Sequence, residues 1–426
     1  MKHILFIFFW ALSFIVYSQT NITGGIFSNQ TWTKANSPYT ITGNTTVFPN
    51  VVLTIEPGVV VKFKPSIQFR VRGTLNINGI ENDSVLFTAE EIDAFNPTQS
   101  WEGVVIDIGQ GGTVSAQYLI FEYSLRGFGL FTGNSTSKVY DFIRCTFRNN
   151  NSVIGSNGDD GYHTSSITYC KFINNTGNIH GLSNAIIDHC SFKNGLSGVS
   201  GSYSTTLTNS EFSDLDFGIA LQDATVDNCY IHHCITGATL WIGLTIINSR
   251  LEYNGTALLA SYPYSYTSTS IHDNIICGNT YGIKGNNSYP YSISNNCWCL
   301  DADDVPTVIY DAYDDALLGI ITFDPIITGC TITPPRIVTP PVSTSISAGS
   351  INNKKINIYP NPTNQLLQFD ETLNNAVITI YTSDSKIISE QKVSTSQIDV
   401  SELSTGYYII SIQTDNEKYH STFIKQ

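Results

Sequence analysis

A six-residue phrase that recurs through the middle of the chain constrains the fold more than any other feature. The phrase alternates apolar and polar residues, as in Ile-Thr-Tyr-Cys-Lys-Phe from Ile167 and Ile-Asp-His-Cys-Ser-Phe from Ile187. Further copies begin at Phe142, Leu207 and Val226, fainter ones at Ile246, Ile271 and Ile293, and an imperfect one at Ala116. Successive copies lie 19 to 26 residues apart, so one copy is too short to bury its own apolar face. The copies are therefore expected to stack on one another.

The period of two within each phrase predicts strands, and no segment of the repeat region keeps a helical period over several turns. Parallel strands stacked about 4.8 Å apart, one set per repeat, form a parallel β-helix. The chain is therefore expected to be all-β.

Two columns of the repeat are expected to face the core. The fourth letters form an inward ladder of mostly small residues: Leu119, Cys145, Cys170, Cys190, Ser210, Cys229, Ser249, Asn274 and Asn296. The sixth letters form a stack of large apolar groups: Phe121, Phe147, Phe172, Phe192, Phe212, Ile231, Leu251, Ile276 and Trp298. Four glycines eight residues past the fourth letter are expected at sharp turns of the coils: Gly198, Gly218, Gly237 and Gly282.

This pattern resembles the right-handed parallel β-helix repeat of secreted carbohydrate-active and surface proteins. The resemblance covers roughly residues 116–296 and implies a fold rather than an activity. Residues 19–112 are rich in strand patterns but lack the phrase, so we assign them to the N-terminal cap and first coils, because terminal repeats are atypical. Residues 113–330 then hold the repeats and the C-terminal closure, which gives about a dozen coils.

The two ends of the chain predict export. Residues 1–18 carry Lys2 and His3, an apolar run from Ile4 to Val16 and then Ser18, which is the pattern of a secretory signal peptide. No later stretch is apolar for long enough to span a membrane, so no transmembrane anchor is expected. The mature protein is expected outside the cytoplasm.

Residues 331–355 form a linker in which Thr-Pro-Pro occurs twice before a run of Ser, Thr, Ala and Gly. Residues 356–426 alternate short strand patterns with Gly and Asn turns, which predicts a small β-sandwich.

The last 71 residues resemble the C-terminal sorting domain of type IX secretion substrates in Bacteroidota. The resemblance depends on Tyr-Pro-Asn-Pro, Thr-Gly-Tyr-Tyr and the terminal Phe-x-Lys, and the sorting motif comprises Tyr359, Pro360, Asn361, Pro362, Gly406, Tyr407, Phe423 and Lys425. One departure is Asp384-Ser385-Lys386, where the family has Gly before Lys. The resemblance implies the type IX machinery as a partner and a secreted or cell-surface location.

Charge narrows the range of ligands. The chain has 21 Lys and Arg against 35 Asp and Glu, and nucleic acid is disfavoured because phosphate binding needs clustered cations. Between Val153 and Cys330 the cations are Lys171, Lys193, Arg250 and Lys284. An anionic polysaccharide would meet net repulsion unless calcium bridged it. The expected ligand is therefore a neutral glycan, bound by a monomer.

The nine cysteines divide into two groups. Those of the fourth-letter column are interpreted as buried small residues, with stacked disulfides as the alternative. Cys277, Cys297, Cys299 and Cys330 cluster near the end of the repeats, where one or two disulfides are expected. Because nine is odd, at least one thiol stays free unless chains cross-link.

Aromatic residues ahead of the fourth letter predict a binding edge, because loops of successive coils line up along a solenoid. Ser-Tyr-Pro-Tyr-Ser occurs twice, and aromatic rings in such rigid loops can stack on sugar faces. The glycan-binding candidates are Tyr162, Tyr203, Asp223, Trp241, Tyr262, Tyr264, Tyr289 and Tyr291. The alternative is that these side chains only cover loop backbone.

Candidates for catalysis are sparse. Asp159, Asp160 and His163 combine two carboxylates with an imidazole, yet Asn-Gly-Asp-Asp-Gly is also a plain turn. His232 and His233 fall on the opposite edge with Asp214 and Asp216, and we interpret them as surface residues, since a metal would need a third ligand from another coil.

No cofactor is expected, although the carboxylates of Asp301, Asp303 and Asp304 leave calcium open.

Two hypotheses remain from the sequence. The favoured one is a secreted or surface protein that binds glycans or acts as an adhesin without catalysis. The alternative is a polysaccharide lyase or glycoside hydrolase with a site at Asp159, Asp160 and His163. A calcium-dependent pectate lyase would need an Arg or Lys base with a carboxylate cluster, and a polygalacturonase would show paired Asp motifs; neither pattern is present.

Overall fold

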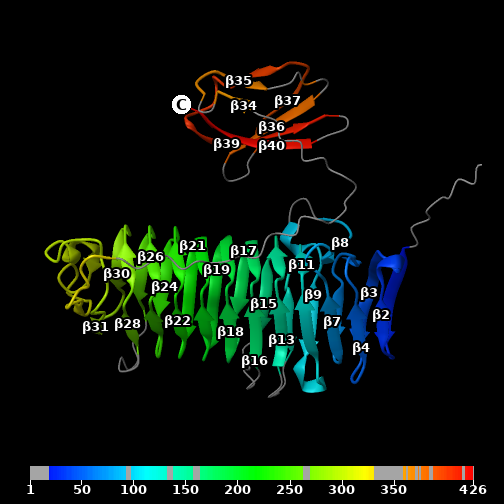
Figure 1. Cartoon of the computed structure of the whole chain (residues 1–426), viewed down its shortest axis with the longest axis horizontal. Helices are drawn as coiled ribbons and strands as arrows, with labels where there is room; N and C mark the ends of the chain where they lie inside the picture. The colour runs from blue at the N-terminus through cyan, green and yellow to red at the C-terminus, as the bar shows by residue number, and fades with distance from the viewer. Residues whose placement is uncertain are drawn as a thin grey trace, which may run out of the picture. The chain divides into compact units, whose positions relative to one another are not determined.

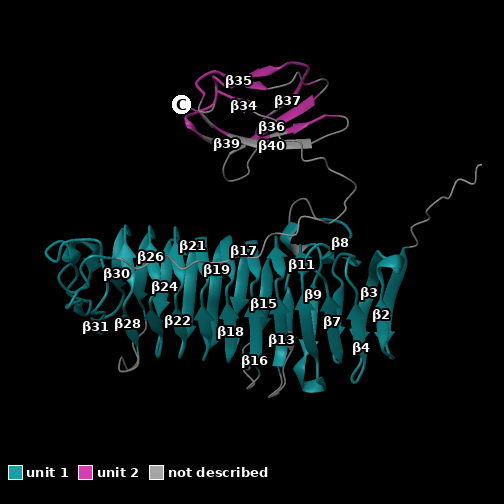
Figure 2. Ribbon diagram, viewed as in Figure 1, with its two compact units in different colours: residues 1–346 teal, residues 347–426 magenta. Residues whose placement is uncertain are grey.

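The computed structural model describes residues 19–92, 97–131, 138–156, 164–261, 269–330, 358–360, 363–369, 373, 376–382, 387–414 and 418–425. The chain divides into two compact units, residues 1–346 and 347–426 (Figure 2). The first unit is the parallel β-helix that the repeat predicts, with a blue-to-yellow progression of coils along its length (Figure 1).

One sheet of the solenoid has eleven strands, and each pairs in parallel with its counterpart in the next coil. Its strands are β2 (Gln30–Trp32), β4 (Val52–Ile55), β7 (Thr74–Asn78), β10 (Thr113–Gln117), β13 (Lys138–Ile143), β16 (Thr164–Thr168), β18 (Ala185–Asp188), β20 (Thr206–Thr208), β22 (Thr225–Asp227), β25 (Thr245–Ile247) and β28 (Ser270–His272). In the copies from Ala116 to Ile271, the first three letters of the phrase belong to this sheet or to the turn that ends it.

The larger sheet has twenty strands. They are β1 (Thr20–Ile26), β3 (Tyr39–Val47), β5 (Val60–Phe63), β6 (Gln68–Val71), β8 (Val85–Ala89), β9 (Gly103–Asp107), β11 (Leu119–Glu122), β12 (Phe128–Phe131), β14 (Thr146–Arg148), β15 (Ser152–Ser156), β17 (Lys171–His180), β19 (Ser191–Tyr203), β21 (Glu211–Gln222), β23 (Tyr230–His232), β24 (Thr236–Leu240), β26 (Arg250–Glu252), β27 (Thr256–Ala260), β29 (Ile275–Cys277), β30 (Tyr281–Gly285) and β32 (Ile309–Tyr310). In most coils two short strands contribute to this sheet, and in β17, β19 and β21 they merge into one long strand.

The sixth-letter column forms the core stack that the sequence predicts. Phe147, Phe172, Phe192 and Phe212 pair in register across β14, β17, β19 and β21, and all four are fully buried. Their ring centroids lie 5.0, 4.4 and 4.6 Å apart along the stack. These spacings follow the distance between parallel strands, which explains why one aromatic per coil fills the interior.

The fourth-letter column is the expected inward ladder of buried small groups. The backbone N–H of Cys190 donates to Ser210 Oγ (3.0 Å), and that of Cys229 donates to Ser249 Oγ (3.0 Å). Ser249 N–H in turn donates to Asn274 Oδ1 (2.9 Å). Cys, Ser and Asn can replace one another in this ladder because the sulfur, hydroxyl or amide oxygen of each accepts a hydrogen bond from the backbone N–H of the ladder residue one coil earlier. The cysteines of this ladder, together with Cys234, are buried free thiols, so the interpretation as small residues is confirmed.

The turns differ from the expectation placed on glycine. The residue before each ladder position adopts a positive φ, including Arg144 (54°), Tyr169 (56°) and His189 (52°). The four glycines that were expected at turns lie inside strands instead: Gly198 in β19, Gly218 in β21, Gly237 in β24 and Gly282 in β30. A Cβ on Gly198 would sit 2.4 Å from the carbonyl oxygen of Gly218. Glycine is therefore needed for the close approach of neighbouring coils rather than for a turn.

Two disulfides lie at the C-terminal end of the solenoid, Cys277–Cys299 and Cys297–Cys330. The expected stapling of this end is confirmed, with both bridges formed. A two-stranded sheet of β31 (Tyr291–Ser292) and β33 (Ile321–Thr322) completes the closure.

The second unit consists of two small antiparallel sheets. One contains β34 (Ile358–Tyr359), β35 (Leu366–Phe369) and β38 (Gln397–Asp399), and the other β36 (Ala376–Thr382), β37 (Ile387–Val393), β39 (Gly406–Gln413) and β40 (Lys418–Lys425). A shared apolar core joins them, with Leu367 and Phe369 from the first sheet against Ile378, Ile410 and Phe423 from the second. The expected all-β fold, a solenoid followed by a small sandwich, is confirmed. No helix within the described ranges is long and apolar enough to span a bilayer.

Candidate functional site

An aromatic row runs along the turn where the large sheet ends in each coil. Tyr203 pairs with Gln222 in the next coil, and Leu221 pairs with Leu240, which places Trp241 beside Gln222 one coil further on. Tyr203 is 38% exposed and Trp241 is half-buried. We call Tyr203, Gln222 and Trp241 the aromatic row. Its two rings are two coil spacings apart, roughly 10 Å.

Backbone contacts hold the row in place. Asp223, which follows Gln222, is exposed and donates its N–H to the carbonyl of Ile242 (2.8 Å). Thr269 Oγ1 donates to the carbonyl of Trp241 (3.2 Å). Of the predicted edge residues, Tyr203, Asp223 and Trp241 thus lie on adjacent coils at one turn.

A cavity of about 460 Å³ adjoins the last coil of this row. It is lined by Leu240, Thr269, Pro290, Tyr291, Ser292, Ile293, Ile320 and Thr322. The predicted residue Tyr291 is only 8% exposed and contributes its ring to the wall, while its hydroxyl accepts a hydrogen bond from Asn287 Nδ2 (3.3 Å). Tyr289 is 40% exposed. The walls are mainly apolar with a few hydroxyl groups, which is the composition of a small-molecule or sugar pocket.

The other predicted edge and catalytic residues lie outside the described ranges. They are Asp159, Asp160, Tyr162, His163, Tyr262 and Tyr264. The flanking described residues are Ser156 and Thr164 for the first group, and Ser261 and Thr269 for the second.

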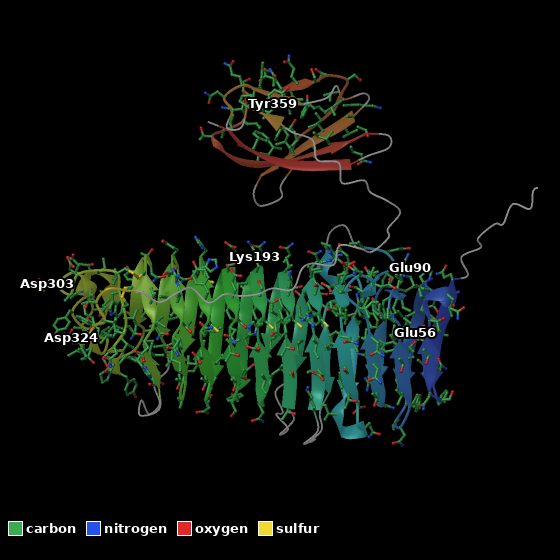
Figure 3. The ribbon with its side chains drawn as sticks, in the orientation of Figure 1. Glu56, Glu90, Lys193, Asp303, Asp324 and Tyr359 are labelled. Atoms are coloured by element: carbon green, nitrogen blue, oxygen red, sulfur yellow. A yellow bond between two sulfur atoms is a disulfide. The ribbon has the colours of Figure 1, made fainter. Side chains whose placement is uncertain are left out.

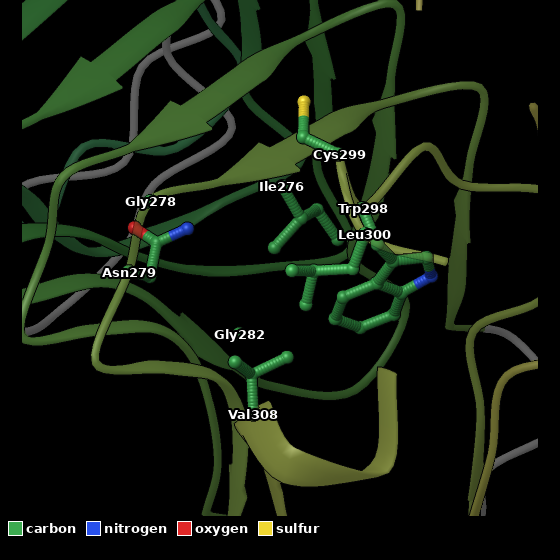
Figure 4. A pocket seen from close by; sticks show the side chains of 8 residues that line it. All are labelled: Ile276, Gly278, Asn279, Gly282, Trp298, Cys299, Leu300 and Val308. Atoms are coloured by element: carbon green, nitrogen blue, oxygen red, sulfur yellow. The ribbon is translucent and has the colours of Figure 1, made fainter. Parts of the chain in front are cut away.

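A second cavity, of about 270 Å³, lies under the closure of the solenoid (Figure 4). Ile276, Trp298, Leu300 and Val308 supply apolar walls. The amide of Asn279 is occupied by the carbonyls of Leu251 (2.8 Å) and Cys277 (3.1 Å). The indole nitrogen of Trp298, which also lines this cavity, is buried without a hydrogen-bond partner among the described residues.

An ionisable cluster that the sequence reasoning missed lies on the outward face of β21, β23 and β26. Glu211, Tyr230 and Arg250 stand in register across these strands, and His232 and Glu252 stand in register two residues on. Arg250 Nη2 contacts both carboxylate oxygens of Glu252, at 2.5 and 2.6 Å. The sequence could have indicated this cluster, because Glu211, Tyr230 and Arg250 are the fifth letters of three consecutive phrases, and the fifth letters face outward on neighbouring strands.

The side chains of this cluster are largely shielded from solvent. The Glu252 and Arg250 side chains are only 7% and 19% exposed. Arg250 Cζ lies 5.3 Å from the centre of the Tyr230 ring, and the His232 ring stacks on Tyr230 at 4.0 Å. Burial, then the charge and hydrogen bond of Glu252, raise the pKa of Tyr230, which the Arg250 charge opposes. Tyr230 is therefore held as a neutral phenol, and the guanidinium is occupied by its partner carboxylate.

In the described part of the chain, three potential metal-ligand atoms lie within 4.8 Å of one another at one group, which comprises Cys277, Cys299 and Cys330. These sulfurs belong to the two disulfides. The calcium candidates Asp301, Asp303 and Asp304 are exposed in the closing loops and form no such group among the described residues. Asp303 is labelled in Figure 3.

The sorting-motif residues come together in the C-terminal unit. Gly406 pairs with Lys425 and Tyr407 with Ile424 in the β39–β40 ladder, and Thr363 bridges to Lys425 directly after the Tyr-Pro-Asn-Pro segment. Phe423 is fully buried, and Tyr359 is exposed in β34 (Figure 3). Asn361 and Pro362 lie outside the described ranges.

Comparison with known protein families identifies the C-terminal unit. No curated protein matches the chain. Solved structures similar to it include a mutant of the periplasmic alginate epimerase AlgG, with a TM-score of 0.31 and 12% identity over 67% of this chain and 76% of that chain. Residues 357–426 match the secretion system C-terminal sorting domain family. The chain therefore carries a type IX sorting domain at its C-terminus, which marks it for secretion or display at the cell surface.

Proposed function

We propose that the solenoid binds extracellular polysaccharide along the aromatic row, and that the protein acts as a secreted or surface glycan-binding or adhesive protein without catalysis. The observation that carries the proposal is the placement of Tyr203 and Trp241 on one turn, next to the 460 Å³ cavity. Aromatic rings on a rigid scaffold bind sugar faces at low entropic cost. A polymer laid along the solenoid axis would meet both rings and the cavity in succession.

Charge supports a neutral glycan over an anionic one. The row carries no cation, and exposed Asp223 lies beside it. In the described solenoid the lysine and arginine side chains nearest in sequence, Lys193 and Arg250, have the acidic partners Asp214 (3.7 Å) and Glu252. A carboxylated polymer would find no matching positive groups here.

The test is a glycan-array screen of the purified protein, repeated with Tyr203→Ala plus Trp241→Ala. Tyr313→Ala is the matched control, because Tyr313 is also an exposed tyrosine and lies in the closing loops. We expect binding to neutral glycans that the double variant loses by tenfold or more and the control keeps. Equal binding by all three proteins would show that the aromatic row is not the glycan-binding site.

A polysaccharide lyase or glycoside hydrolase is the second candidate function. The partly buried cluster of Tyr230, His232, Arg250 and Glu252 favours it, because ionisable groups gathered on one face are candidates for acid–base catalysis. Soluble-product assays with bound glycans distinguish the candidates. An enzyme is supported if the unmodified protein releases product and if that activity is lost in His232→Ala or in the triple alanine variant of Asp159, Asp160 and His163. A binding protein without catalysis is supported if the glycan stays intact.

A further inference from the structure

Two adjacent histidines at the end of β23 direct the same ring nitrogen at each other. His232 closes the strand, and His233 adopts a positive φ of 55° at the turn. As a result the two side chains converge rather than pointing to opposite faces of the strand, as neighbours in a strand otherwise do. Their Nδ1 atoms are 2.7 Å apart.

The neighbouring carboxylate determines which nitrogen carries a lone pair. Glu211, from the preceding coil, lies 3.1 Å from His232 Nε2. An ionised carboxylate only accepts hydrogen bonds, so His232 Nε2 carries a proton, and in the neutral imidazole His232 Nδ1 then carries the lone pair. That lone pair accepts the Nδ1–H of His233. A carboxylate behind a histidine in this manner is the arrangement that orients metal-binding imidazoles.

We propose that His232 and His233 form a copper(II)-type metal site, in which His233 Nδ1 releases its proton to solvent and both rings rotate so that the two Nδ1 lone pairs turn from each other toward one ion beside the N···N line. Two nitrogens at right angles about a metal, each about 2.0 Å from it, are about 2.8 Å apart, whereas a tetrahedral arrangement separates them by about 3.3 Å. The observed 2.7 Å is the length of the hydrogen bond between the two nitrogens, and it is already close to the separation that two adjacent ligands of a tetragonal Cu²⁺ ion need, so only ring rotation is required to form the site. Cu²⁺ also binds nitrogen sites most tightly among the common divalent ions.

The surroundings hold the rings and leave room for further ligands. The His232 ring stacks on Tyr230 at 4.0 Å, and the His233 ring stacks on Tyr253 at 5.6 Å. The His232 side chain is 14% exposed, while His233 is exposed, so water can complete the coordination sphere from the solvent side. Asp214 occupies the turn position of His233 one coil earlier, where it pairs with Lys193 at 3.7 Å.

Two other histidines among the described coils make a different contact. The Nδ1 atoms of His189 and His272 each contact the carboxylate of a neighbouring residue, Asp188 (2.7 Å) and Asp273 (2.6 Å). His272 is therefore a matched control: it lies on the same solenoid at the end of β28 and beside a turn, but offers one nitrogen.

The experiment is a Cu²⁺ titration of the full chain by calorimetry, with electron paramagnetic resonance to count nitrogen ligands. We expect a site whose spectrum shows two equivalent nitrogens. His232→Ala and His233→Ala should each weaken binding at least tenfold and remove one nitrogen, and Glu211→Gln should weaken it about 10- to 100-fold while keeping both nitrogens. His272→Ala should change neither measurement.

Circular dichroism of each metal-free variant confirms that it is folded, so loss of binding can be assigned to the site. Binding that persists in folded His232→Ala, or a spectrum without two nitrogens in the unmodified chain, would overturn the proposal. Because the readout is metal binding, the result is independent of whether the aromatic row binds glycans.

Discussion

Phe172 and Phe192 stack one coil apart, with ring centroids 4.4 Å from each other and planes 9° from parallel. Both are fully buried, and each also stacks on the next ring of the same row. A single ring in the middle of this row therefore contacts aromatic neighbours on both sides.

Phe192→Ala removes that central ring. We expect the free energy of unfolding to fall by about 3–5 kcal/mol, because the loss of buried apolar surface adds to the cavity left between two coils. Urea denaturation followed by circular dichroism measures it. Lys193→Ala, on the outward side of the same strand, is the control and should change stability by less than about 0.5 kcal/mol. Similar values for the two variants would contradict the stacked core.

The buried ion pair of Arg250 and Glu252 predicts a second stability effect. Glu252→Ala leaves the guanidinium largely buried without its carboxylate, which is expected to cost about 3–5 kcal/mol. The comparison is Asp214→Ala, which breaks the exposed pair with Lys193 and should cost less than about 1 kcal/mol. Thermal unfolding of both variants tests this, and equal shifts in Tm would show that burial does not distinguish the pairs.

The thiol ladder predicts a loss of stability in alkali. Burial raises the pKa of Cys229 to about 12 from an ordinary value of 9.0. The unfolded thiol ionises first as pH rises, so the stabilising contribution is complete below about pH 9 and is lost between about pH 9 and about pH 12. Urea unfolding at pH 8 to 11 should show a slope that Cys229→Ser reduces. An identical slope in the variant would contradict this origin.

The two disulfides predict a local effect of reduction. Cys277–Cys299 and Cys297–Cys330 tie the last coils to the closing segment. A disulfide stabilises the folded state typically by about 2–4 kcal/mol, mainly because it constrains the unfolded chain. The loss of stability on reduction should appear first at this end, because repeats contact only their neighbours. Hydrogen exchange should therefore rise near β29 and β30 after mild reduction and stay unchanged near β5 and β8. A uniform rise would contradict local stapling.

The inward face of the solenoid could be predicted from sequence because the core imposes a period. Phe147 through Phe212 must be apolar, and the ladder from Cys145 to Asn296 must be small and able to accept a hydrogen bond, so both columns repeat visibly. The outward face carries no such requirement. Which side chains meet there depends on register between coils of 19 to 26 residues, which alignment of one column does not reveal.

The His232–His233 convergence shows the limit most clearly. Adjacent residues in a strand point to opposite faces, so the sequence alone indicates two unrelated surface histidines. The positive φ at His233 brings the two side chains together instead. The same conformation occurs at Asp214 and Tyr253, so it cannot be predicted from the type of residue. The pairing of four clustered cysteines was likewise open, since three pairings satisfy the same spacing.

The structure of the sorting domain leads to a prediction about export when packing of its last strand, β40, is weakened. Phe423 is fully buried in β40 and packs on Tyr408 with ring centroids 5.4 Å apart, while β40 pairs with β39 along its whole length. Phe423→Ala should destabilise this small domain by about 3–5 kcal/mol, which is a large part of the stability of a domain of this size. In the native host we expect the variant to accumulate inside the cell envelope, as measured by fractionation and immunoblotting. Glu402→Ala, an exposed change in the same domain, should reach the surface or medium like the unmodified chain. If the Phe423 variant is exported at the normal level, recognition does not require a packed β39–β40 pair, and the machinery would then have to read the terminal segment in extended form.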